Sequence, residues 1–306
     1  RDGSSRFGPD RQWGNFGSVG AGWIFSSESW MKASAPWLSY GKLRASYGTI
    51  GNDQIQDYGY LSTYTTTPYS YSGTGILPAR LANPNYGWET NHKVDLALET
   101  GFLKDRILLT ATWFSSRTGN QLVSAPLSSQ AGFTSYQANL PALLQSTGWE
   151  WELKTINIKG KDLTWTSSFN LTIPRNKLVS FPGLSKTIYA YSYIVGQPIN
   201  NYNGYHFTGL TNGVATVADL NKDGSITQGL QQTLKGDFYM LGLSSPKYYG
   251  GFSNTLQYGK FQLDILFQFV KQLKPGFRQS NATAPGFMIN QDSHILSDGF
   301  KPSMTA

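Results

Sequence analysis

The sequence predicts an all-β protein, an antiparallel transmembrane β-barrel of which this chain forms a part. Three observations predict this fold: apolar and polar residues alternate along many segments, short turns alternate with long polar loops, and few residues are charged. Charged residues make up 14% and aromatic residues 14% of the 306-residue chain. A soluble domain has about 25% charged residues, whereas a transmembrane barrel has an apolar outer band rimmed by aromatic girdles.

The segment Lys260–Val270 shows the alternation most clearly. One face carries Phe261, Leu263, Ile265, Phe267 and Phe269, and the other carries Gln262, Asp264 and Gln268, with Leu266 and Val270 breaking the pattern. Strand side chains point alternately to opposite faces, and roughly 9–11 tilted residues cross a bilayer. We therefore expect a membrane-spanning strand with Ile265 on its lipid face.

Taken in order, the chain opens with a polar, glycine-rich segment, Arg1–Phe16, that is expected to be a loop or strand junction. A short turn or helix is expected within Ser26–Trp37, and a long loop follows the weak strand that ends at Thr65. The predicted strands are Ser18–Phe25, Leu38–Asn52, Tyr58–Thr65, Lys93–Phe102, Arg106–Arg117, Gly148–Ile158, Leu163–Ile173, Tyr248–Tyr258 and Phe261–Val270. Boundary error leaves a total of roughly ten strands.

The connections between these strands are of two kinds. Short turns are predicted at Lys104-Asp105, Lys159–Asp162 and Gly259-Lys260. Long loops are predicted at Arg117–Gly148, Pro174–Met240 and from Lys271 onward. Short turns at one end and long loops at the other are typical of outer-membrane barrels, whose long loops lie outside the cell.

Composition and charge exclude several classes of function. The chain has no cysteine, which excludes disulfides, zinc–thiolate sites and cysteine nucleophiles. The chain contains no run of 18 apolar residues, so no transmembrane helix is predicted, and we expect no signal peptide at Arg1. The net charge is +7, but the 25 Lys and Arg residues are scattered. We therefore expect no nucleic-acid partner and a basic surface near anionic lipid headgroups.

One segment matches a metal-binding pattern. Asp219–Ile226, DLNKDGSI, matches the first eight positions of an EF-hand-type calcium loop. Oxygen ligands at alternate positions and a glycine at the turn suit a hard cation, so Asp219, Asn221, Asp223 and Ser225 are the candidate calcium ligands. The twelfth position, where such loops carry Glu, is Leu230. The alternative is an Asp/Asn-rich turn in an extracellular loop.

No motif predicts an enzyme. The three histidines, His92, His206 and His294, lie far apart without metal-ligand spacing. Glu150 and Glu152 share one face of a strand, and a polar lumen lining explains them more simply than a hydrolase pair. The Asn281 glycosylation sequon is a pattern common by chance.

Aromatic residues concentrate in two loops and several strands. The tyrosine-rich loops, Tyr58–Tyr71 and Tyr189–Tyr205, suit either sugar or peptide binding or an aromatic belt at the membrane interface, and the sequence leaves both open. The tryptophans within strands favour belt or lipid-facing positions; these are Trp113, Trp149, Trp151 and Trp165.

Seven blocks, in order, resemble the SusC/RagA group of TonB-dependent outer-membrane transporters of Bacteroidetes. The blocks are Arg1–Trp23, Lys42–Asn52, Asn83–Thr90 (NPNYGWET), Gly148–Leu153 (GWEWEL), Val195–Ile199 (VGQPI), Asp219–Thr227 and Ser245–Phe252. The resemblance implies that residues 1–306 are the later part of a single plugged barrel of about 22 strands. The plug and the N-terminal domains are expected to lie outside this chain.

The implied function is active import of a nutrient, an oligosaccharide or alternatively a peptide, without catalysis. The implied partners are outer-membrane lipid, TonB acting through the plug, and a SusD-like surface lipoprotein that caps the extracellular loops. An arc of about ten strands would leave two unpaired edges in lipid, so further strands are expected elsewhere. Two alternatives remain: a passive porin or surface-binding barrel, and a secreted carbohydrate-binding β-protein whose apolar strand faces pack against a second sheet.

Overall fold

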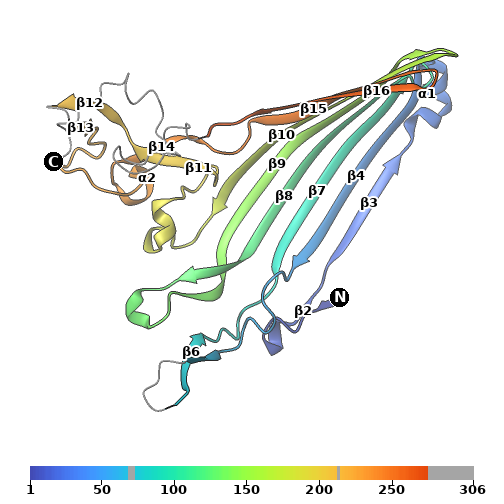
Figure 1. Cartoon of the computed structure of the whole chain (residues 1–306). Helices are drawn as coiled ribbons and strands as arrows, with labels where there is room; N and C mark the ends of the chain where they lie inside the picture. The colour runs from blue at the N-terminus through green and yellow to red at the C-terminus, as the bar shows by residue number, and fades with distance from the viewer. Residues whose placement is uncertain (68–72, 212–213, 275–306) are drawn as a thin grey trace.

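The computed structural model describes residues 1–67, 73–211 and 214–274. Its main body is one curved antiparallel sheet of eight strands in the order β16-β15-β10-β9-β8-β7-β4-β3 (Figure 1). The strands are β3 (Gly17–Trp23), β4 (Leu38–Asn52), β7 (Glu89–Phe102), β8 (Ile107–Pro126), β9 (Ser135–Lys159), β10 (Leu163–Ser180), β15 (Tyr248–Tyr258) and β16 (Phe261–Lys271). The order follows the chain without crossovers and leaves β3 and β16 at the two edges, as expected for an arc of an up-and-down barrel.

The remaining elements are small. Two-stranded sheets pair β1 (Asp2–Gly3) with β2 (Trp13–Gly14), β5 (Thr63–Thr67) with β6 (Gly75–Arg80), β11 (Asn201–Tyr205) with β14 (Phe238–Leu243), and β12 (Phe207–Thr211) with β13 (Val214–Val217). The α-helices are α1 (Ser29–Ser34) and α2 (Gln231–Leu234); 3-10 turns span Pro9–Arg11, Phe25–Ser27, Ser129–Ala131, Leu184–Lys186 and Ile188–Tyr191. Over the described ranges, no helix is both long and apolar enough to span a membrane.

The strand register collects the predicted apolar residues on one face, which we call the apolar face. One row of directly paired residues crosses the sheet with no polar side chain: Trp23, Leu43, Leu98, Ala111, Trp151, Leu171, Gly250 and Phe269. Leu98, in the middle of this row, is 41% exposed. The predicted alternation is therefore confirmed across the sheet.

No second sheet covers the apolar face within the described part of the chain. The other sheets there have only two strands each, and Leu43, Leu96, Trp149 and Trp151 remain exposed. Exposing so many large apolar side chains to water would be unfavourable. The alternative of a secreted β-protein with a second packed sheet does not agree with this architecture.

The connections agree with the prediction of short turns at one end of the strands and long loops at the other, although some predicted bounds are wrong. The three predicted short turns lie at one end, beside α1, and the smaller sheets lie at the other end (Figure 1). The predicted loop Arg117–Gly148 is wrong, because β8 and β9 continue as a hairpin to Pro126 and from Ser135. The eight strands of the sheet are close to the roughly ten predicted, whereas the weak strand Tyr58–Thr65 is Thr63–Thr67 in a separate hairpin. The predicted loop from Lys271 onward lies mostly outside the described residues.

A small hydrophobic core lies where β9 and β10 extend toward the long-loop end. Ala142, Leu178, Phe181 and Leu184 are buried there, with Leu140, Leu144, Tyr189, Tyr193 and Ile199 packed around them. Leu178 also joins the following loop through hydrogen bonds with the backbone of Gly196 and Gln197. This core makes the start of the predicted loop Pro174–Met240 an ordered structure that includes the last residues of β10.

Candidate functional site

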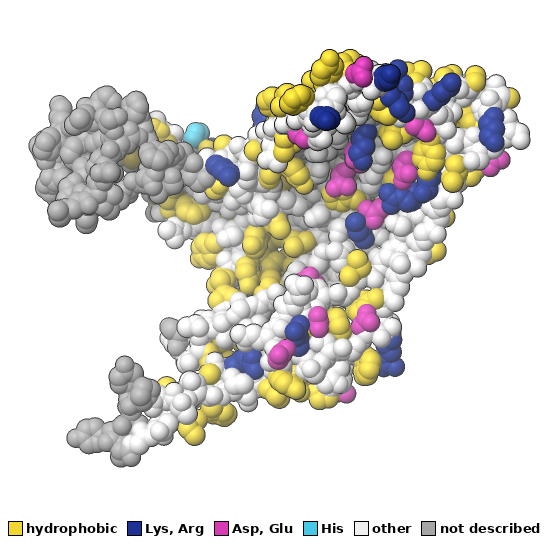
Figure 2. Space-filling view, turned by 45° about the vertical axis from the view of Figure 1, so that its right-hand side comes forward, with side chains coloured by type: hydrophobic (Ala, Val, Ile, Leu, Met, Phe, Trp, Pro, Cys, Tyr) yellow, Lys and Arg dark blue, Asp and Glu magenta, His cyan; other side chains and the backbone are white. Residues whose placement is uncertain are grey.

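The face opposite the apolar face, which we call the polar face, carries the charged residues from the middle of β4, β7 and β9. They are Lys42, Arg44, Lys93, Asp95, Glu99, Glu150, Glu152 and Lys154. Three ion pairs link them: Arg44 Nε to Glu99 Oε1 at 3.4 Å, Lys93 Nζ to Asp95 Oδ1 at 3.2 Å, and Lys154 Nζ to Glu152 Oε1 at 2.7 Å. Figure 2 shows basic and acidic side chains interspersed over the sheet. Such a surface suits a water-filled lumen, in agreement with the interpretation of Glu150 and Glu152 as lumen lining.

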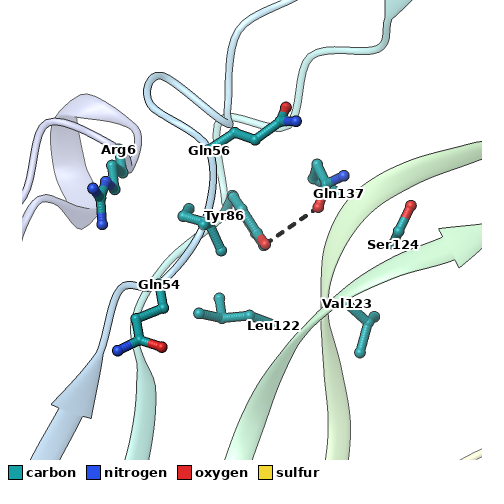
Figure 3. Close-up of a pocket in the computed structure, with 9 residues that line it drawn as sticks. Arg6, Gln54, Gln56, Tyr86, Leu122, Val123, Ser124 and Gln137 are labelled. Atoms are coloured by element: carbon teal, nitrogen blue, oxygen red, sulfur yellow. Dashed lines mark hydrogen bonds between the residues drawn. The ribbon is translucent and has the colours of Figure 1, made fainter.

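A pocket of about 620 Å³ opens at the long-loop end of the sheet (Figure 3). It is built from Arg6, the segment Gln54–Gln56 after β4, Tyr86 before β7, the segment Leu122–Ser124 of β8, and Gln137 of β9. The Tyr86 hydroxyl donates to Gln137 Oε1 over 3.4 Å, and the Ser124 hydroxyl donates to that of Ser135 over 2.8 Å. The pocket thus combines amide and hydroxyl groups with a few apolar side chains.

Aromatic packing between distant segments positions this pocket. Phe7 is buried between Tyr86, at 5.9 Å between ring centroids, and Trp88, at 5.1 Å. The indole Nε1 of Trp88 donates to the carbonyl of Gln12 over 3.1 Å. Gly8 is needed at this junction because a Cβ there would collide with the carbonyl oxygen of Pro84. Two sequence blocks of the resemblance, around Phe7 and Asn83–Thr90, therefore pack against each other.

Arg6, the one charged residue among the described residues that line this pocket, is paired with carboxylates. Arg6 Nε donates to Asp57 Oδ1 over 2.9 Å, and Arg6 Nη1 lies 3.7 Å from Asp53 Oδ2. The hydrogen bond to Asp57 raises the pKa of Arg6, which keeps the guanidinium charged but paired. Burial, with a smaller contribution from the charge of Glu89, raises the pKa of Tyr86 to about 12, so its hydroxyl is a neutral donor.

One polar group of this pocket is unpaired. Within the described residues the side-chain amide of Gln54 has no hydrogen-bond partner. Amides and hydroxyls in this arrangement can hydrogen-bond a neutral, polar ligand. The sequence signals for the pocket are weak, because glutamine and serine carry no distinctive spacing and the pocket is assembled from five separate segments. Sequence reasoning therefore missed it.

The predicted calcium ligands lie together in one compact loop. Asp219 accepts hydrogen bonds from the backbone of Lys222 (2.6 Å) and Gly224 (2.8 Å), and Asp223 accepts from the backbone of Ser225 (2.8 Å). The Asn221 amide donates to Asp223 Oδ2 over 2.8 Å. These oxygens form the kind of donor set that a hard cation prefers. The buried Leu230 supplies no twelfth-position carboxylate.

A buried carboxylate that sequence reasoning missed holds this loop in place. Asp237 is fully buried and accepts hydrogen bonds from the backbone amides of Leu220 (2.7 Å) and Thr227 (2.7 Å) and, over 3.4 Å, of Asn221. The bond from Thr227, followed by the others, lowers the pKa of Asp237 against the opposing effect of desolvation. Asp237 therefore acts as a structural clamp on the loop.

The other singled-out residues are spread through the fold. Tyr189 and Tyr193 stack at 6.1 Å in the small hydrophobic core, whereas His92 Nδ1 lies 3.3 Å from the hydroxyl of Tyr47. Among the described residues, no three His, Cys, Asp or Glu side chains gather in a way that could hold a metal ion. His294 and the Asn281 sequon lie outside the described residues.

The predicted strand tryptophans share the apolar face. Trp149 and Trp151 stack at 5.8 Å between ring centroids, and Trp113 pairs with Trp149 across β8 and β9. Trp165, on the same face of β10, pairs with Leu256 and Ile158. This placement agrees with the expectation of belt or lipid-facing positions.

Comparison with known proteins gives a consistent result. No family model matches the chain. A TonB-dependent receptor of Formosa agariphila, P39, is 31% identical over 212 residues, 69% of this chain and 20% of that protein. A second receptor from the same organism, P26, is 29% identical over 295 residues, 87% of this chain and 29% of that protein. The TonB-dependent receptor SusC of Bacteroides thetaiotaomicron is 28% identical over 279 residues, 82% of this chain and 28% of that protein.

This chain belongs to the SusC/RagA family of TonB-dependent receptors. The solved structure of the RagAB peptide transporter has the same fold, with a TM-score of 0.73 at 23% identity over 87% of this chain and 30% of that chain. The family resemblance read from the seven sequence blocks is thereby confirmed. The chain spans between a fifth and three tenths of the length of these curated relatives.

Proposed function

We propose that this chain forms part of the barrel wall of a SusC-like transporter that imports a nutrient across the outer membrane. The eight-strand sheet carries the proposal, because one face suits hydrocarbon and the other, with its three ion pairs, suits water. The test is uptake of a labelled nutrient by the native host with and without the gene. Loss of uptake on deletion and its return on complementation are expected, and unchanged uptake would contradict the proposal.

TonB, acting through the plug of the full-length receptor, supplies the energy, and a SusD-like lipoprotein caps the long-loop end. The curated relatives, all named TonB-dependent receptors, support this part of the proposal. An uncoupler that collapses the proton gradient should abolish uptake. Uptake that persists with the uncoupler would instead favour a passive porin. Affinity purification of the tagged full-length receptor should recover a lipoprotein of the SusD type.

The substrate is a neutral oligosaccharide, with a peptide as the alternative. Support comes from the pocket at the long-loop end, where amides and hydroxyls predominate and Arg6 is already paired with Asp57. Gln54→Ala and Gln137→Ala in the full-length receptor should weaken oligosaccharide binding measured by calorimetry. Lys186→Gln, a substitution at an exposed residue outside the pocket, is the control. Tight binding of peptides, unaffected by these two changes, would reverse the assignment.

The loop of Asp219, Asn221, Asp223 and Ser225 is proposed as a weak calcium site. Its oxygen-rich donor set supports this, and the absence of an acidic residue at Leu230 argues for low affinity. Calcium added to chelator-treated receptor should raise the melting temperature, and Asp223→Ala should remove the effect. An equal shift with magnesium or in the variant would contradict a specific site.

A further inference from the structure

The end of the sheet with the short turns carries a band of basic and aromatic side chains. We call it the short-turn end and define it as residues 24–37, 103–106, 159–162 and 259–260. It contains α1 and the three tight turns between neighbouring strands, which meet in one corner of Figure 1. Neither the polar face nor the pocket at the long-loop end includes any of these residues.

Hydrogen bonds link the four segments to one another, directly or through strand residues beside them. The backbone amide of Asp105 donates to the Ser39 hydroxyl, just after α1, over 3.0 Å. Arg106 Nη2 donates to the carbonyl of Asn157, beside the next turn, over 2.7 Å. The amide of Gly259 donates to the carbonyl of Asp162 over 3.0 Å. The charges on these turns therefore act on one surface.

Positive charge is in excess on this surface. Its basic residues are Lys32, Lys104, Arg106, Lys159, Lys161 and Lys260, against three acidic residues, Glu28, Asp105 and Asp162. All five lysines are exposed, and none forms an ion pair within the described structure. At the opposite end, residues 118–147 of the long β8–β9 hairpin contain no charged side chain. The short-turn end therefore has twice as many basic as acidic residues, and the long hairpin at the opposite end adds no charge of either sign.

Aromatic side chains surround the lysines. Trp30 is 54% and Trp37 is 61% exposed, and Tyr258 and Phe261 are exposed beside the last turn. Trp37 stacks on Phe102 at 5.8 Å, and Trp23 packs 6.5 Å from Trp30. Tryptophan and tyrosine favour the headgroup level of a bilayer because their rings are apolar and their N–H or O–H groups are polar. Figure 2 shows dark blue and yellow side chains next to one another at the end of the sheet that comes forward.

We propose that the short-turn end binds the headgroups of anionic phospholipids in the leaflet next to it. The lysine ammonium groups contact the lipid phosphates, while the exposed indole rings sit between the headgroups and the acyl chains. The charge excess selects anionic over zwitterionic lipid. This inference rests on the proposed transmembrane placement of the sheet and adds a lipid-selective surface to it.

The test uses the purified full-length receptor in detergent with equal amounts of phosphatidylglycerol and phosphatidylcholine of the same chain length. Native mass spectrometry counts the retained lipids of each kind. The variant carries Lys104→Gln, Lys159→Gln, Lys161→Gln and Lys260→Gln. The matched control replaces four exposed lysines of the other end by glutamine: Lys177→Gln, Lys186→Gln, Lys235→Gln and Lys247→Gln.

Each lysine near an anionic surface contributes about fivefold in affinity, so the short-turn variant should lose at least about tenfold in its preference for phosphatidylglycerol. The control should keep the preference of the wild type. Equal lipid preference in the short-turn variant and the wild type, or an equal loss in the control, would overturn the proposal.

Heat-dependent migration of the folded barrel on gels checks assembly. If the fourfold variant does not assemble, Lys104→Gln with Lys260→Gln provides the same comparison. A folded, membrane-inserted receptor without lipid preference contradicts only this inference. A protein that never enters the membrane contradicts the proposed function as well.

Discussion

Replacing Ile265 by arginine tests which face of the sheet meets lipid. Ile265 lies on the apolar face of β16 and is 42% exposed. A strand rises about 3.4 Å per residue, which at a tilt of about 40° gives about 2.6 Å per residue along the membrane normal. The eleven residues of β16 thus nearly span a hydrocarbon core of about 30 Å. Ile265 is one residue from the central Leu266, so it lies near the midplane.

An arginine at the midplane costs about 2–4 kcal/mol on a lipid-facing strand. Since about 1.4 kcal/mol is a factor of ten, the folding equilibrium of Ile265→Arg should fall about 30- to 700-fold. The assay is urea unfolding of the full-length receptor in lipid vesicles, in which heat-dependent migration on gels measures the folded fraction at each urea concentration. Gln268→Arg, on the opposite face of the same strand, is the matched control and should change stability little. Normal assembly of Ile265→Arg together with failure of Gln268→Arg would refute the face assignment.

The remaining predictions concern the loops. Because the pKa of Asp237 is lowered, its stabilisation is present above the ordinary carboxyl pKa of about 4 and is lost as the pH falls through the lower folded value. The protection of the Leu220 and Thr227 amides from hydrogen exchange, taken relative to the intrinsic exchange rate at each pH, should therefore fall at acidic pH, and Asp237→Asn should lower it already at pH 7. Protection unchanged in that variant would show that Asp237 is not the clamp. Because burial raises the pKa of Tyr86 to about 12, its stabilisation is present below the ordinary tyrosine pKa of about 10 and is lost between pH 10 and 12; Tyr86→Phe should flatten this part of the stability profile in urea. Gly8→Ala should release the N-terminal segment from the Tyr86 region and increase its proteolysis, because the added Cβ meets a backbone carbonyl, whereas resistance equal to wild type would contradict that packing.

The faces of the strands could be predicted because one physical rule decides them. Leu98 and Glu99 are neighbours in the chain, but their side chains point to opposite faces of the sheet. Period-two alternation therefore assigns each of them to its face without any long-range information. The short turns could also be predicted from the local sequence. Gly259, for example, adopts a left-handed φ of 55° that glycine accepts at little cost.

The parts that the sequence did not predict depend on distant contacts or on mixed environments. The extensions of β8 and β9 carry polar residues such as Gln121 and Gln137 among apolar ones, so the alternation fades where no lipid face selects it. The pocket depends on Phe7 packing with Tyr86 and Trp88, which lie about eighty residues away along the chain. Asp237 has no local signature, because its partners Leu220 and Thr227 are joined to it only by the folded loop.

A spin-label scan of β7 tests the central claim most directly. The chain contains no native cysteine, so single substitutions from Val94→Cys to Thr100→Cys in the full-length receptor can be labelled one at a time. In lipid vesicles, labels at Val94, Leu96, Leu98 and Thr100 should collide with lipid-soluble oxygen, and those at Asp95, Ala97 and Glu99 should not. Uniform accessibility along β7, or the opposite alternation, would contradict a membrane-spanning wall with its apolar face in lipid.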